Sequence, residues 1–178
     1  MTPPPINLKN RPLAALLTYL VPGLGHLYQG RTSKGILYGV CILGLYFVGL
    51  AMGEWRNVYW RWVSPVQDSE RFCFYYLGQF FAGLPALPAL IQATLLHYGH
   101  GPILGGFLAE PSQNQINSLY QPLGKMVEMG SLYTTIAGLL NILAIFDAYE
   151  GPAHRDADEA AETTVASSDV LSKAGASA

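Results

Sequence analysis

The chain has 178 residues, of which 51% are hydrophobic and 12% are charged, and its formal net charge is −2. Because an average soluble domain carries about 25% charged residues, this composition argues against a soluble globular domain. The sequence has no basic patch of the kind that binds nucleic acid.

Four apolar stretches predict an all-α, multi-pass membrane protein. They cover residues 12–28, 35–53, 72–98 and 130–149, and the only acidic or basic side chain within them is that of Asp147. A bilayer core of about 30 Å is crossed by roughly 20 apolar residues of helix. We therefore expect one membrane helical domain, residues 12–150, with about four transmembrane helices in a bundle.

The N-terminal part begins with a polar, Pro-rich leader, residues 1–11, followed by the expected first span. That span closes on the stretch "LVPGLGHLYQG", which we interpret as a helix end and turn. Its defining residues are Pro22, Gly23, Gly25, His26, Tyr28 and Gly30. A dinucleotide loop, G-x-G-x-x-G, is excluded because Tyr28 replaces the third glycine. A cleaved signal peptide is the alternative to a retained span.

The second span, residues 35–53, carries small residues on one face. At 100° per residue its glycines share a stripe with Ile42 and Tyr46. These glycines are Gly35, Gly39, Gly49 and Gly53. Gly-x-x-x-Gly pairs let helix backbones approach closely, so we expect this stripe to pack against another helix of the chain. Self-association of two chains is the alternative.

The middle of the chain alternates between loops and one long apolar stretch. Residues 54–71 contain all three tryptophans and are expected at the membrane surface, as a short amphipathic helix or as an irregular loop. Residues 72–98 would be about 40 Å long as one helix, so this third span must tilt or bend, and Pro85 and Pro88 mark the expected bend. Residues 99–129 form the longest predicted loop.

The last span, residues 130–149, contains the polar side chains of greatest interest. Gly138 and Asn141 belong to a second stripe of small residues, which we expect to face the first, with the Asn141 amide bonded to another helix. An ionisable group in a membrane is a functional candidate by default, so Asp147 is either an ion- or proton-handling group or a structural ion-pair partner. The expected partners for Asp147 are Arg56, Arg61 or Arg71.

Charge distribution predicts the orientation. With four spans, the side that holds both termini carries most of the Lys and Arg, so both termini are predicted to be cytoplasmic and the membrane to be the inner (plasma) membrane. If residues 12–28 re-enter instead of crossing, the basic residues divide evenly, which disfavours that alternative. Residues 151–178 are predicted to be a disordered, acidic tail.

No catalytic, cofactor-binding or metal-binding pattern stands out. His97 and His100 are three residues apart, and four alternating spans would place His26 on the same side. The sequence lacks the usual zinc motifs, so we interpret these histidines as polar residues at the interface. Cys41 and Cys73 are expected to lie too far apart for a disulfide. We therefore expect no enzyme activity and no cofactor.

The stretch "LVPGLGHLYQGRTSKGILYGV" resembles the hairpin of the two-transmembrane-helix domain. With the later runs "FYYLGQFFAGLPALPALIQ" and "LYTTIAGLLNILAIFDAY", the chain is similar to a bacterial family of uncharacterised small multi-span membrane proteins, a domain of unknown function. This resemblance covers residues 12–150 and implies an architecture but no activity.

The function expected from these observations is non-enzymatic: an integral membrane protein that serves as a structural, scaffold or assembly component. The alternative is a small transporter or channel that uses Asn141 and Asp147. The expected partners are the lipid bilayer and either other membrane proteins or further copies of the chain, with no nucleic acid.

Overall fold

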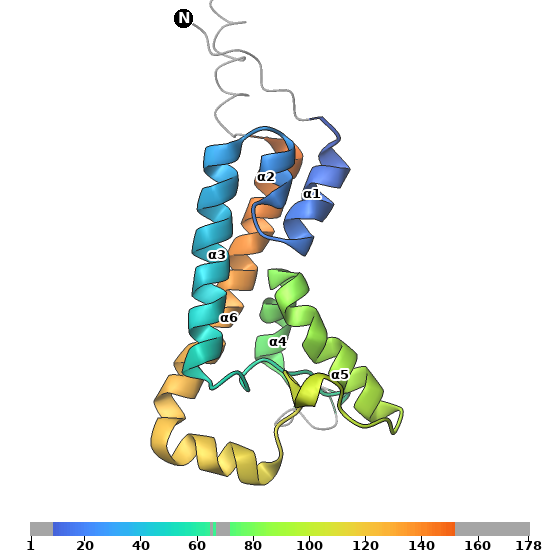
Figure 1. Ribbon diagram of the computed structural model, residues 1–178, viewed down its shortest axis with the longest axis vertical. Helices are drawn as coiled ribbons and strands as arrows, with labels where there is room; N and C mark the ends of the chain where they lie inside the picture. The colour runs from blue at the N-terminus through green and yellow to red at the C-terminus, as the bar shows by residue number, and fades with distance from the viewer. Residues whose placement is uncertain (1–8, 65, 67–71, 152–178) are drawn as a thin grey trace, which may run out of the picture.

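The computed structural model describes residues 9–64, 66 and 72–151, and within these residues the fold is helical throughout, without a β-strand (Figure 1). Most of the predicted leader and tail, residues 1–8 and 152–178, lies outside the described residues.

Two long antiparallel helices, α3 (Thr32–Met52) and α6 (Gln113–Glu150), form the frame of the molecule (Figure 1). All of α3 and the Gly124–Glu150 part of α6 are long and apolar enough to cross a membrane. The two helices approach closely at a pair of glycines, since a Cβ atom built on Gly49 would lie 2.7 Å from the Gly130 carbonyl oxygen. Such close approach requires the small residues that both helices present.

Residues 12–28, predicted as one span, form a short helical hairpin instead. Helix α1 (Arg11–Leu20) is capped by Asn10, whose side chain accepts a hydrogen bond from the main chain of Leu13. At Gly23, where φ is 86°, the chain reverses into α2 (Leu24–Tyr28). Ten residues of α1 rise about 15 Å, which is half a bilayer core. We refer to α1 and α2 as hairpin 1.

Residues 72–98, predicted as a bent third span, also reverse. Helix α4 (Phe74–Gln79) continues into the 3₁₀ turns η1 (Phe80–Ala82) and η2 (Leu84–Ala86), and α5 (Leu87–His97) then runs back. The reversal occurs at Gly83, with φ of 83° and ψ of −137°, a conformation open mainly to glycine. Pro85 and Pro88 each stand in a first helical turn, so they begin helices and do not bend one. We refer to this unit as hairpin 2.

The two hairpins enter the frame from opposite ends and meet near its middle (Figure 1). Gly83, at the tip of hairpin 2, lies directly against the carbonyl oxygens of Tyr19 and Leu20 at the tip of hairpin 1, where any Cβ atom would clash. The prediction of four uninterrupted spans therefore does not describe this chain, because two of the four stretches turn back at a glycine with positive φ.

The connecting segments differ from the predictions in one respect. Residues 54–63 have no helix, as in the irregular-loop alternative, whereas part of the predicted 99–129 loop is helical. After the short turn η3 (Leu104–Gly106), α6 already begins at Gln113, with a reciprocal capping box between Ser112 and Gln115. The first turns of α6 lie across the base of the molecule (Figure 1). Their polar composition concealed this helix in the sequence.

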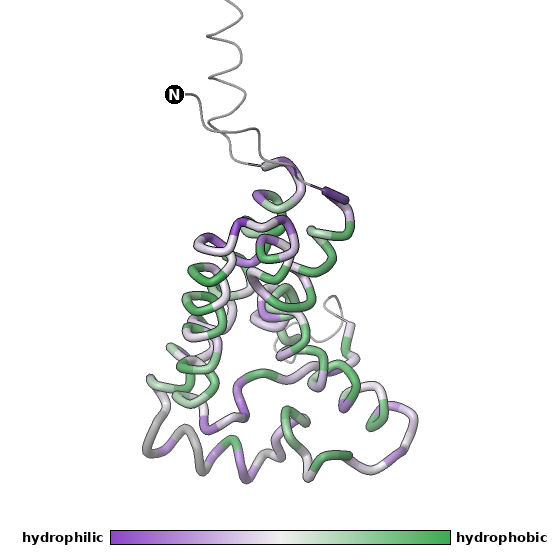
Figure 2. Tube along the Cα trace, turned by 45° about the horizontal axis from the view of Figure 1, so that its top comes forward, coloured by the Kyte–Doolittle hydropathy of each residue, from purple (hydrophilic) through white to green (hydrophobic). Residues whose placement is uncertain are grey.

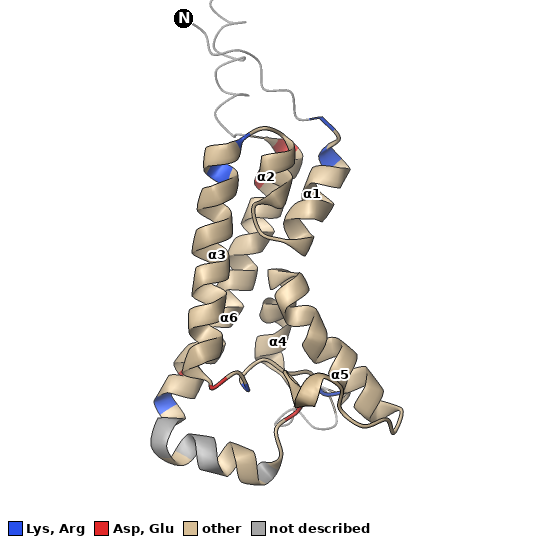
Figure 3. Ribbon diagram, in the orientation of Figure 1, with Lys and Arg blue, Asp and Glu red and all other residues tan. Residues whose placement is uncertain are grey.

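Charged side chains gather at the two ends of the frame and are absent from its described middle (Figure 3). The hydropathy of the chain follows the same division, with apolar residues along the middle of the helices (Figure 2). Along α6, the nineteen residue steps from Glu128 to Asp147 rise about 28 Å. Residues 9–11 and Gly151 lie at the same end, which we call the terminal end, and the opposite end is the base.

Candidate functional site

Two cationic side chains and one histidine converge on the carboxylate of Asp147 at the terminal end. Arg31 Nη2 lies 2.6 Å from Asp147 Oδ2, His26 Nε2 lies 2.9 Å from the same oxygen, and Lys34 Nζ lies 3.5 Å from Oδ1. The His26 side chain is fully buried and those of Arg31 and Asp147 are 7% and 17% exposed. We call these four residues the carboxylate cluster.

Two of the three predicted partners of Asp147, Arg56 and Arg61, were wrong. Arg56 and Arg61 belong to the base of the molecule, and Arg71 lies outside the described residues. The reason is the reversal at Gly23, which returns Arg31 to the terminal end, where α6 also finishes. Hydrogen bonds from Arg31 Nη1 to the Asp147 main-chain oxygen and from Gln29 Nε2 to that of Ala148 complete the attachment of this turn to α6.

Asn141 joins the tips of both hairpins to α6. Its Nδ2 donates to the main-chain oxygens of Thr18, at 3.1 Å, and Phe81, at 2.9 Å. The side chain is fully buried, and its Oδ1 has no hydrogen-bond partner among the described residues. A main-chain carbonyl oxygen left without a donor in an apolar interior is costly. The two bonds to Thr18 and Phe81 therefore hold both hairpins at one point on α6.

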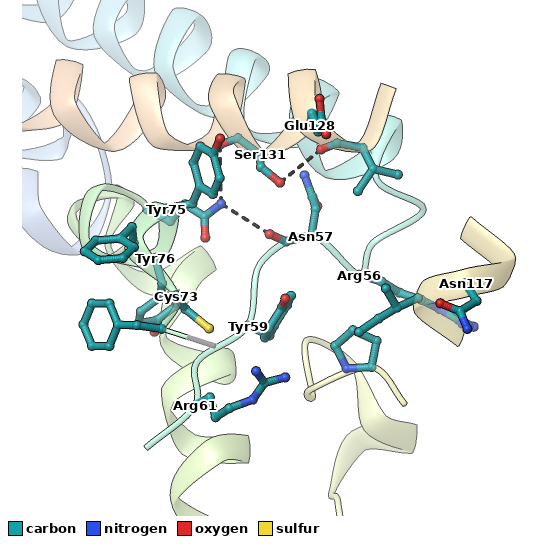
Figure 4. Close-up of a pocket in the computed structure, with 16 residues that line it drawn as sticks. Arg56, Asn57, Tyr59, Arg61, Cys73, Tyr75, Tyr76, Asn117, Glu128 and Ser131 are labelled. Atoms are coloured by element: carbon teal, nitrogen blue, oxygen red, sulfur yellow. Dashed lines mark hydrogen bonds between the residues drawn. The ribbon is translucent and has the colours of Figure 1, made fainter. Parts of the chain in front are cut away.

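The base contains a cavity of about 470 Å³ between α4, α6 and the irregular segment 54–63 (Figure 4). Its lining combines polar, charged and aromatic side chains. The principal ones are Arg56, Asn57, Tyr59, Cys73, Glu128 and Ser131. We call it the basal pocket, and its size is that of a small-molecule site.

The inner end of the basal pocket is closed by hydrogen bonds. Gln79 Nε2 donates to Thr134 Oγ1 at 2.8 Å and to the Asn57 main-chain oxygen at 3.3 Å. Asn57 Nδ2 in turn donates to the Gly49 main-chain oxygen at 2.9 Å, and within the described chain Asn57 Oδ1 has no partner.

Two ionisable groups at the basal pocket are shifted by their surroundings. A hydrogen bond to Glu110, at 2.5 Å, raises the pKa of the Arg61 guanidinium and keeps it charged. Burial raises the pKa of the Cys73 thiol, because the thiolate is disfavoured away from water. Neither Cys73 nor Cys41 forms a disulfide with a described residue.

Most of the remaining residues of the predicted turn and stripes lie at close contacts with other parts of the chain. Gly23 lies against the Gly35 and Gly39 main chain, next to Pro22, and Gly25 against α1. Gly138 lies against the main chain of Gly78, and Gly53 against the Asn57 side chain. Tyr28 accepts a hydrogen bond from Lys9 through its carbonyl oxygen, and Gly30, with φ of 83°, faces open space.

The three histidines considered for a metal do not converge. His26 lies in the carboxylate cluster, whereas His97 ends α5 at the base, because hairpin 2 turns back before reaching the terminal end. Among the described residues no group of three His, Cys, Asp or Glu side chains could hold a metal ion.

Sequence reasoning missed the buried amides that fasten loops and hairpins. Gln79 and Gln92 are each 1% exposed, and Gln92 binds the main chain of Ile103 and Phe107. The available signal was their position, since these are the two amide side chains in the otherwise apolar stretch 72–98. A buried amide in such a stretch requires hydrogen-bond partners.

A family model matches residues 13–161 and is described as a family of unknown function, DUF6677. No curated protein and no solved structure matches the chain significantly.

Proposed function

The chain belongs to this family of unknown function, and we propose that it is an integral membrane protein with a non-enzymatic role, a structural, scaffold or assembly component. Two membrane-spanning helices, α3 and the later part of α6, would carry two half-length hairpins inserted from opposite faces. The lipid bilayer and further membrane proteins, or a second copy of the chain, are the proposed partners.

Three features support the membrane location. The charges divide between two ends about 28 Å apart along α6, close to the bilayer core thickness of about 30 Å. Only 28% of the apolar window of α3 and 39% of that of α6 are buried, whereas the core helix of a soluble protein is mostly buried. Their exposed sides carry large apolar residues such as Val40, Phe47, Leu143 and Phe146.

The orientation follows from basic residues. Among the described residues, the terminal end carries Lys9, Arg11, Arg31 and Lys34, and the base carries Arg56, Arg61 and Lys125. The positive-inside rule places the richer side in the cytoplasm. We therefore propose that both termini are cytoplasmic and that the protein lies in the inner (plasma) membrane.

The structural role rests on how Asn141 and Asp147 are used. Asp147 is held by three side chains and Asn141 by two main-chain oxygens. A group that carries an ion or proton must exchange partners during a cycle, whereas these contacts attach both hairpins to α6. This use of the two polar residues is the observation that supports a scaffold over a transporter.

A small transporter or channel is the second candidate, and the basal pocket favours it. Broken helices that meet near the middle of a membrane are typical of transporter binding sites. The pocket opens at the base and brings Arg56 and Glu128 to its wall. In this alternative the contact between the hairpin tips would be the closed gate.

One preparation separates the two candidates. The full chain is purified from its native membrane in mild detergent for native mass spectrometry, and is also reconstituted in liposomes loaded with a pH-sensitive dye. The scaffold proposal expects a stoichiometric membrane-protein partner or a defined homo-oligomer, and proton flux equal to that of empty liposomes. Flux above empty liposomes that is lost in Glu128→Gln but kept in Glu150→Gln would overturn it in favour of transport.

A further inference from the structure

A groove beside hairpin 2 has one polar end and one apolar end. Trp60 and Trp62 line two neighbouring cavities, of about 190 and 300 Å³, and divide them. The smaller cavity also contains Arg61, His97 and Glu110. The larger one is otherwise lined by Tyr76, Leu77, Phe80, Phe81 and Leu90. We call the two cavities together the Trp60–Trp62 groove.

The apolar end is a preformed aromatic wall that is open to the outside. The Trp60 ring packs edge-on against Trp62, with centroids 5.8 Å apart, and in a tilted arrangement against Tyr76, with centroids 5.4 Å apart. Trp62, Leu77 and Phe81 remain 51%, 50% and 38% exposed. In the proposed membrane this side faces acyl chains, which fit an apolar groove between α4 and α5 without any loss of hydrogen bonds.

The polar end presents one cation and one anion side by side. Arg61 Nη2 lies 2.5 Å from Glu110 Oε1, and the two side chains are 17% and 35% exposed. An arginine fork is suited to phosphate, and a carboxylate accepts hydrogen bonds from an ammonium group. The Arg61–Glu110 pair has no net charge. It therefore complements a headgroup with one positive and one negative group better than a headgroup with a negative group alone.

We infer that the Trp60–Trp62 groove binds one phospholipid of the bilayer whose headgroup combines a phosphate with a primary ammonium. The phosphate lies at Arg61, the ammonium donates to Glu110, and one acyl chain follows Trp60 toward Phe81. A trimethylammonium headgroup cannot donate to the carboxylate, and a purely anionic headgroup places a second negative charge beside Glu110. This inference rests on the proposed membrane location and not on the scaffold role.

Quenching of tryptophan fluorescence by acyl-brominated lipids tests the site, because bromine quenches only on contact. The full-length Trp55→Phe variant retains just Trp60 and Trp62, since the chain has three tryptophans. It is reconstituted in phosphatidylcholine vesicles containing brominated phosphatidylethanolamine, phosphatidylcholine or phosphatidylglycerol. We expect the apparent affinity for the ethanolamine lipid to exceed that for either other lipid at least threefold.

Charge variants identify the headgroup contacts. Glu110→Gln should remove the preference over phosphatidylcholine, and Arg61→Gln should weaken quenching by all three lipids at this site. A Trp60→Phe/Trp62→Phe variant, which reports only from Trp55, should show no preference and serves as the control. Circular dichroism and gel filtration exclude misfolded variants, and Arg61→Lys replaces Arg61→Gln if the latter misfolds.

The outcomes are distinct. Equal quenching by the three lipids, or a preference for the anionic lipid, overturns the proposed site while leaving the membrane location intact. An absence of quenching by every lipid overturns the site together with the membrane location.

Discussion

Arg31 and Asp147 form an ion pair of 2.6 Å although they lie 116 positions apart in the sequence. The pair exists because hairpin 1 turns back at Gly23 and delivers Arg31 to the end of α6. The Arg31–Asp147 pair can therefore form only if residues 12–28 turn back and do not cross the membrane. Loss of the pair should loosen the attachment of hairpin 1 to α6.

We expect Asp147→Asn to lower the free energy of unfolding by about 1.5–3 kcal/mol, the range for losing a hydrogen bond to a charged group. Arg31→Gln should have a similar effect, and the double variant should cost less than the sum of the two. Unfolding by sodium dodecyl sulfate in mixed micelles measures the change. The control is Arg11→Gln at an exposed position, and additive effects of the pair would contradict the ion pair.

Asn141→Ala should destabilise the fold by about 1–3 kcal/mol, because it leaves two buried carbonyl oxygens without their donor. Hydrogen–deuterium exchange should rise at both hairpin tips, around residues 18–21 and 80–84. Leu140→Ala, on the exposed side of the same helix, is the matched control. If exchange rises at only one tip, Asn141 does not join the two hairpins.

Gly83→Ala tests the contact between the hairpin tips. Gly83 and Gly99 both have positive φ, 83° and 78°, but only at Gly83 would a Cβ atom meet another part of the chain. Gly99→Ala carries only the cost of a positive φ, about 1 kcal/mol, without a contact. We expect Gly83→Ala to lower the thermal midpoint of unfolding clearly more than Gly99→Ala, and equal midpoints would argue that the tips are apart.

Single cysteines placed in a Cys41→Ser/Cys73→Ser background test the topology. Asn10 caps α1 and Ser33 lies in the first turn of α3, both at the terminal end, whereas Asn114 lies in the first turn of α6, at the base. An impermeant maleimide added outside sealed cells should therefore label only Asn114→Cys if the termini are cytoplasmic. Four crossing helices would instead place Ser33→Cys on the side of Asn114→Cys, so their joint labelling would contradict both hairpins.

The Cys73 thiol should react late in a pH titration. Because burial raises the pKa of this thiol, the thiolate that attacks iodoacetamide forms only at higher pH than in the unfolded chain. In a Cys41→Ser background, the alkylation rate of the folded protein should rise at higher pH than that of the denatured protein. Coincident profiles would indicate that Cys73 is accessible to water in the folded state.

The sequence by itself determined the all-helical class, the unusually low charge and, among its four predicted spans, the apolar helices over residues 35–53 and 130–149. These properties depend on composition and on periodicity along one segment. The sequence also predicted the stripes of small residues on α3 and α6, and it placed the polar side chain of Asn141 within the second stripe. Each of these properties is local, so hydropathy and helical spacing suffice to predict it.

Tertiary structure decided which apolar stretches turn back. Hydropathy does not distinguish a helix that crosses from two half-helices that reverse at Gly23 or Gly83, because the same apolar residues serve both. The difference lies in a glycine backbone at positive φ packed against a neighbouring carbonyl oxygen, which is a property of the partner segment. Because both stretches turn back, Asp147 pairs with Arg31 and not with the arginines of the base. For the same reason Asn141 contacts both hairpins.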